Sequence, residues 1–271
     1  MKYILYRFKL IKTWRWIAVS IFLLGLSSES FKTLSFYGLQ PTLLELIIKQ
    51  TNNVSTLSLY FIFLIIIFDI GLNDIPTLEI SIKQSRIFQD YFFVYAISLL
   101  YLILIIIINI LYILLISGNL NLSNEWVTAP LFTDSWASIP ALDVNGITPL
   151  SASAISFLLL TFRFGLFTFL VFTINQNCKQ HPWGYLGGLI ICLIDAVAYY
   201  TFNVVNLAGI FPFEHSFLYS VMNLTSSISL NILISVLYWV ALSSLSGIAL
   251  VCLRRSKKLT RRYRHEANHL F

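Results

Sequence analysis

Charge is scarce in this sequence. Of its 271 residues only 11% are charged, while 58% are hydrophobic. A soluble domain carries about 25% charged and about 45–50% apolar residues, so a soluble fold of this length cannot bury such a surplus. Several stretches approach the roughly 20 apolar residues that cross a bilayer. The scarcity of charge therefore excludes an ordinary soluble domain and predicts an integral membrane protein of the multi-pass type, located in the cell membrane.

Motifs typical of catalysis and metal binding are also missing. The sequence has no GxSxG, HExxH or CxxC motif and no glycine-rich phosphate loop followed by lysine. Its three cysteines are scattered, and its histidines show no paired spacing within an apolar stretch. We therefore predict a protein that is not an enzyme, has no metal site and binds no cofactor. His215 with its neighbouring serines leaves a membrane-embedded hydrolase as an alternative.

Six apolar stretches predict an all-α membrane domain over residues 1–253 with six transmembrane helices. Pro41 suits the start of a helix, so we expect a further short helix on the outer face before the second span. The first fifteen residues mix basic and apolar side chains, which predicts a short amphipathic helix at the membrane interface. The predicted spans cover residues 16–36, 54–72, 91–116, 152–174, 185–207 and 228–253.

The basic residues predict the orientation of these spans. With both termini in the cytoplasm, the inner segments hold 15 of the 18 Lys and Arg residues: five at the N-terminus, two in the second-to-third loop, one in the fourth-to-fifth loop and seven in residues 254–271. Cytoplasmic loops carry this excess in membrane proteins. Residues 254–271 are therefore predicted to be a basic cytoplasmic tail. The net charge of +6 reflects orientation in the bilayer, and we expect no nucleic-acid partner.

Two charged residues fall in the middle of predicted spans. Arg163 lies 11 residues into the fourth span, and Asp195 lies 10 residues into the fifth, which runs in the opposite direction. A lone charge at this depth costs at least about 2.5–3.5 kcal/mol, so we predict that the two side chains pair. Three interpretations of the pair are open: an ion pair that fixes helix register, a substrate pathway or moving contact, and a proton relay through Asp195.

Two further patterns concern contacts of the predicted helices. Ser243 and Gly247 lie four residues apart in the last span, a small-xxx-small pattern that permits close helix packing. Glu29 and Lys32 lie three apart in the first span, where they are placed to pair on one helix face.

Three segments and their order carry a resemblance to one family. PTLLELIIKQTNN precedes the second span, IKQSRIFQDYF precedes the third, and IFPFEHSFLYS precedes the sixth. A basic amphipathic N-terminus and a basic tail enclose them. Over most of its length the chain thereby resembles the small permease subunits of ABC-2-type exporters, especially those of Gram-positive bacteria.

The resemblance implies a subunit that moves a peptide, lipid or drug-like substrate, with ATP bound by a separate ATPase subunit and a second permease chain, the same or related, beside it. Residues 208–227 would form a partly re-entrant outer helix. Residues 74–90 would be the coupling helix, although an ordinary solvated loop is the alternative there. A non-transporting sensor, immunity or assembly protein is the alternative for the whole chain. The implied contacts with the ATPase come from Glu79, Lys83, Arg86 and Asp90.

Overall fold

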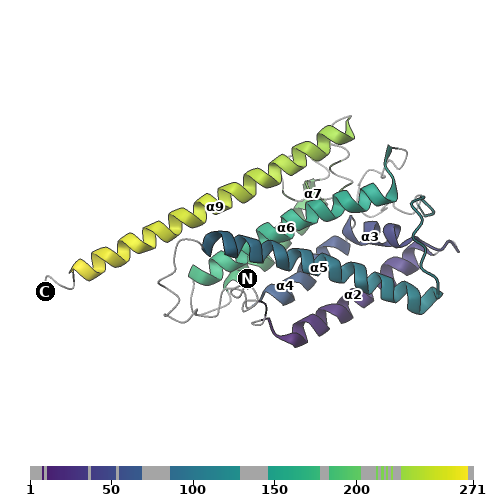
Figure 1. Cartoon of the computed structure of the whole chain (residues 1–271), viewed down its shortest axis with the longest axis horizontal. Coiled ribbons are helices and arrows are strands. Elements are labelled where there is room, and N and C mark those ends of the chain that lie inside the picture. Colours follow the sequence, from purple (N-terminus) through teal and green to yellow (C-terminus); the bar gives the residue numbers. More distant parts are fainter. Residues whose placement is uncertain are drawn as a thin grey trace.

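The computed structural model describes most of the chain, and its regular elements there are all α-helices (Figure 1). The described residues are 8, 11–35, 38–52, 55–68, 86–128, 146–177, 183–202, 212, 215–216, 218, 221 and 227–267. The helices are α2 (Thr13–Leu34), α3 (Leu43–Thr51), α4 (Ser55–Ile67), α5 (Arg86–Ser117), α6 (Pro149–Asn177), α7 (Trp183–Phe202) and α9 (Ile228–Ala267).

Within the described ranges four helices, α2, α5, α6 and α9, are long and apolar enough to cross a membrane. Their apolar stretches correspond to the first, third, fourth and sixth predicted spans. The second predicted span differs, because α4 has only 13 residues and is joined to α3 through a bend of 82°. The two short helices together make a fifth candidate span. The interfacial helix predicted at the N-terminus lies mostly outside the described residues.

Helix α9 lies along the outside of the bundle (Figure 1). It packs against α6, and the buried side chain of Trp239 anchors it beside Leu159 and Val221. The helix does not stop where the predicted span ends: it continues to Ala267 through most of the basic tail. Figure 1 shows this C-terminal part projecting beyond the other helices.

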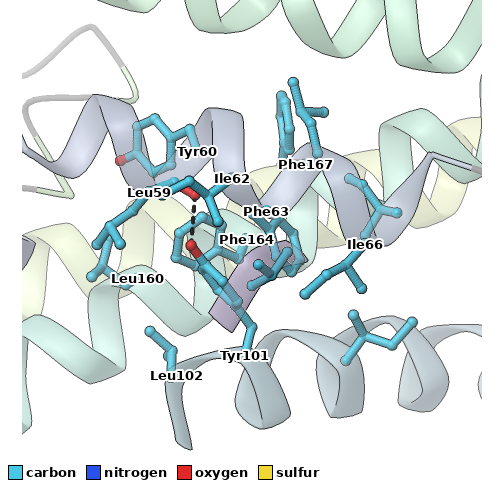
Figure 2. Close-up of a cluster of buried hydrophobic side chains, with 14 of the residues drawn as sticks. Leu59, Tyr60, Ile62, Phe63, Ile66, Tyr101, Leu102, Leu160, Phe164 and Phe167 are labelled. Carbon is cyan, nitrogen blue, oxygen red and sulfur yellow. Dashed lines mark hydrogen bonds between the residues drawn. The ribbon is translucent and has the colours of Figure 1, made fainter. Parts of the chain in front are cut away.

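Aromatic side chains form the core that joins α4 to α5 and α6 (Figure 2). The ring centroids of Phe63 and Phe164 lie 4.6 Å apart, and Tyr101 meets Phe164 edge to face at 5.3 Å. The Tyr101 hydroxyl donates a hydrogen bond of 2.9 Å to the carbonyl oxygen of Leu59. Aromatic pairs at such distances contribute beyond their buried area, so this cluster fixes α4 between its neighbours.

The short helix expected after Pro41 forms as α3. Its placement on the outer face of the membrane stays a prediction, but its burial was not expected: the helix lies inside the bundle. It packs against α2, α4, α5 and α6, and all but one of its side chains are buried. A helix with this many polar residues is stable inside a bundle only when those residues are hydrogen-bonded. Glu45, Gln50 and Thr51 all form such bonds.

A candidate functional site around the break between α3 and α4

The N-terminus of α3 is held by a fully buried carboxylate, that of Glu45. A capping box forms there: the Thr42 backbone N–H donates to Glu45 Oε2 (2.9 Å), and the Glu45 N–H donates to Thr42 Oγ1 (3.1 Å). The other carboxylate oxygen accepts from the N–H groups of Val127 (2.7 Å) and Thr128 (2.5 Å). Three backbone N–H groups thus satisfy both oxygens of this buried carboxylate. Glu45 therefore ties the segment before α6 to α3.

The middle of the site is a cluster of three buried polar side chains, Ser27, Gln50 and Asn109, which we call the amide cluster. Asn109 Nδ2 donates to Gln50 Oε1 (2.8 Å), and Gln50 Nε2 donates back to Asn109 Oδ1 (3.0 Å). Ser27 Oγ lies 2.8 Å from Asn109 Oδ1 and 3.2 Å from Gln50 Nε2. The amide cluster thus joins α2, α3 and α5 at one point in an otherwise apolar interior.

Asn52 occupies the C-terminal end of α3 and connects it to two other parts of the chain. Its Nδ2 donates to Ser156 Oγ on α6 (2.7 Å) and to the Ile48 carbonyl (3.2 Å). Its Oδ1 accepts from the backbone N–H of Leu218 (2.6 Å). Thr56 Oγ1 donates to the carbonyl of Gln50, which the break releases from helical bonding (3.1 Å). Side chains therefore satisfy the backbone groups that the break exposes, as a low-dielectric interior requires.

Arg163 lies next to this site on α6 and is 5% exposed. Its Nη1 donates to Ser216 Oγ at 2.8 Å, and its guanidinium lies 4.5 Å from the ring centroid of Tyr60. A cation over an aromatic face is stabilised in this geometry. The partner expected from the sequence, Asp195, belongs to α7, but its side chain lies outside the described part, so the pairing stays a prediction.

His215 is the histidine of the predicted hydrolase alternative. Its Nδ1 lies 3.0 Å from Ser235 Oγ on α9, and its ring stacks on Tyr238 at a centroid distance of 4.0 Å. Trp239 Nε1 donates to the backbone carbonyl oxygen of His215 (2.9 Å). A histidine and a serine at hydrogen-bonding distance are the beginning of a nucleophilic site. Both side chains are, however, buried, and these contacts fix the segment containing His215 against α9.

The other residues singled out from the sequence lie away from this site. Ser243 Oγ lies 2.8 Å from the hydroxyl of Tyr95 on α5, and Gly247 lies one turn further along α9. Of the expected coupling residues, Arg86 and Asp90 lie in the first turns of α5. Their side chains, and Glu79 and Lys83 altogether, fall outside the described residues. Among the described residues no group of three or more His, Cys, Asp or Glu could hold a metal ion.

The amide cluster and Asn52 were missed by the sequence analysis, although the sequence carries a signal for each. Asn109 interrupts the run IIIINIL within a predicted span, and Gln50 to Asn53 form a polar run directly before another. A polar side chain at membrane depth needs an internal partner. A search for hydrogen-bond partners among the isolated polar residues of the predicted spans would have brought Asn109 and Gln50 together and so located the site.

Comparison with protein-family models, with curated proteins and with solved structures finds no match to this chain. Its class is therefore defined by the architecture of the described residues: they are helical, with four apolar candidate spans, a bent fifth, and hydrogen-bonded polar side chains inside the bundle.

Proposed function

We propose that this chain is the transmembrane subunit of an ABC-type exporter that works with a separate ATPase subunit. The observation that carries the proposal is the break between α3 and α4, with buried polar side chains from α2, α5 and α6 gathered around it. Transporters form their substrate and ion sites at discontinuous helices. A membrane anchor has no need of such a break, whose backbone groups are costly to satisfy at membrane depth.

The segment before α9 supports the same proposal. His215, Ser216, Leu218 and Val221 are all buried. This segment bonds to α3 through Asn52, to α6 through Arg163 and to α9 through Ser235. Buried residues between α7 and α9 that bond to three helices fit the partly re-entrant outer helix that the resemblance implies for residues 208–227.

The proposed topology has six crossings and both termini in the cytoplasm of the cell. The bent α3–α4 pair and α7 each count as one crossing, in addition to α2, α5, α6 and α9. The basic part of α9 then lies on the cytoplasmic side, as expected for a segment rich in lysine and arginine. The substrate is a peptide, lipid or drug-like molecule, and a second permease chain completes its pathway.

The test of this proposal is purification of the tagged chain from its native host in several mild detergents, followed by mass spectrometry. We expect an ATP-hydrolysing subunit in a near-equal amount, together with a second permease chain if the complex is heterodimeric. Recovery without any ATPase in every detergent would refute the exporter and favour a non-transporting sensor, immunity or assembly protein.

The coupling segment is tested in the same preparation. The double charge reversal Glu79→Lys/Arg86→Glu should abolish recovery of the ATPase, because both residues are expected to face it, while the chain itself remains in the membrane. The control is Glu125→Lys, which reverses an exposed charge in the segment before α6. An ATPase that still co-purifies with the double variant would show that residues 74–90 are not the coupling segment.

A further inference from the structure

A groove with a volume of about 460 Å³ lies between α2 and α4. Most of its lining is apolar, and one end carries a carboxylate. The lining residues are Phe22, Gly25, Leu26, Glu29, Ser58, Phe61, Ile62 and Ile65. Pockets that bind small molecules have volumes of about 300–1,000 Å³ and combine apolar walls with a few polar groups. The groove meets both criteria.

Gly25 produces the hollow. A Cβ atom added to it would meet no atom within 4 Å, so the absence of a side chain leaves open space there. The groove lies on the side of α2 that is turned away from the rest of the bundle, where Ile21 and Phe22 are 63% and 57% exposed. On an apolar candidate span this side faces lipid. A hydrophobic molecule can therefore reach the groove directly from the bilayer.

Glu29 supplies the charge, and nothing in the described part of the chain neutralises it. Its side chain forms no hydrogen bond or ion pair among the described residues, including none with Lys32 three positions on. Both side chains are exposed. At a rise of 1.5 Å per residue, Glu29 lies about 8 Å before the last residue of α2, Leu34, and about 24 Å from the first, Thr13. In a hydrocarbon core about 30 Å thick this places the carboxylate near one edge.

We propose that the α2–α4 groove binds a single-chain amphiphile with a cationic headgroup. The headgroup meets Glu29 near the edge of the bilayer, and the alkyl chain extends toward the middle over Gly25, between Phe22 and Phe61. Charge complementarity selects a cation, because the carboxylate is the one charged group of the lining. The volume lies in the lower half of the range for ligand pockets, which favours one alkyl chain over a two-chain phospholipid. The proposal concerns binding by this chain alone, so it holds or fails independently of the exporter function.

The experiment uses the full chain in nanodiscs of phosphatidylcholine and two photoreactive probes. One is dodecyltrimethylammonium with a diazirine on its alkyl chain, and the other is dodecanol with the same diazirine. Labelled peptides are identified by mass spectrometry. We expect saturable labelling by the cation within Thr13–Leu34 and Ser55–Ile67. Labelling that never saturates, or that is spread equally over α9, would overturn the proposal.

Two variants separate the charge from the shape of the groove. Glu29→Gln should weaken the apparent affinity for the cation roughly tenfold, equivalent to about 1.4 kcal/mol, and leave labelling by the neutral probe unchanged. Gly25→Leu should fill the groove and abolish saturable labelling by the cation. The controls are Glu125→Gln, which removes an exposed carboxylate elsewhere, and Ser244→Leu, which places the same leucine side chain at an exposed position of α9.

Three outcomes would refute this assignment. If the Glu29→Gln variant and the unchanged protein bind the cationic probe with equal affinity, the carboxylate does not contribute to binding. Loss of labelling when phosphatidylethanolamine replaces phosphatidylcholine would assign the groove to a two-chain lipid. Crosslinks between two copies through α2 in place of probe labelling would show that the groove is an interface between chains.

Discussion

Replacing Gln50 and Asn109 by leucine, singly and together, tests the amide cluster directly. The two side chains exchange two hydrogen bonds of 2.8 and 3.0 Å, and both are buried. Leucine has a similar size and no polar atoms. Each single variant therefore removes both bonds and leaves one amide in the interior without its main partner, whereas the double variant removes the bonds and both amides.

The expected magnitude follows from this geometry. A side-chain hydrogen bond within a membrane protein contributes about 0.6 kcal/mol on average and about 1.7 kcal/mol at most, so two contribute roughly 1–3 kcal/mol. An amide left unsatisfied costs a further 1–3 kcal/mol or so. We expect each single variant to lose about 2–4 kcal/mol of unfolding free energy and the coupling energy of the cycle to reach about 1–3 kcal/mol, as is usual for residues in contact.

The assay is reversible unfolding in mixed micelles of mild detergent and dodecyl sulfate, followed by circular dichroism and tryptophan fluorescence. Ser244→Ala is the control, because in the described part of the chain Ser244 bonds only to its own helix, at the carbonyl of Val240, and is exposed. Its free energy of unfolding should stay within about 0.5 kcal/mol of the unchanged protein. Losses in the two single variants that simply add in the double variant would refute the reasoning, since independent residues behave in that way.

Two further predictions concern charged residues of the helices. Glu45→Gln should lose about 1–3 kcal/mol of unfolding free energy, because an amide offers only one oxygen to the N–H groups of Thr42, Val127 and Thr128. Hydrogen exchange at the last two amides should become faster, and unchanged exchange there would contradict the role given to Glu45. For the predicted ion pair, Arg163→Met and Asp195→Asn should each lower the temperature of unfolding, and the double variant should recover part of the loss. Purely additive losses would exclude the pairing.

The long apolar helices were predictable because their signal is local. The run of Ile and Leu in the third predicted span, 91–116, corresponds closely to the apolar part of α5, Phe92–Ser117. A span needs only enough consecutive apolar residues, and the sequence contains that information directly. The bend between α3 and α4 was not predicted, since a hydropathy pattern gives length and composition but not the direction of a chain between two short helices.

The burial of α3 was not predictable from its own residues. Pro41 and the Thr42–Glu45 capping box mark the start of a helix, and the sequence analysis expected a short helix on the outer face there without indicating that it is buried in the bundle. The partners of its polar side chains are distant in the chain: Asn109 lies 59 positions from Gln50, and Ser156 lies 104 positions from Asn52. The position of α3 is therefore decided by tertiary contacts, and only a search for partners among the few polar residues of the spans would have indicated it.

The position of α3 also explains how separate parts of the chain can act together. Its N-terminus is bonded to the segment before α6 through Glu45, and its C-terminus to the segment before α9 through Asn52. That second segment also accepts the bond from Arg163. A displacement of this nine-residue helix would break or stretch these bonds together, because packed interiors rearrange between discrete states and do not deform continuously. If the bundle has two conformations, α3 is the element whose position would distinguish them.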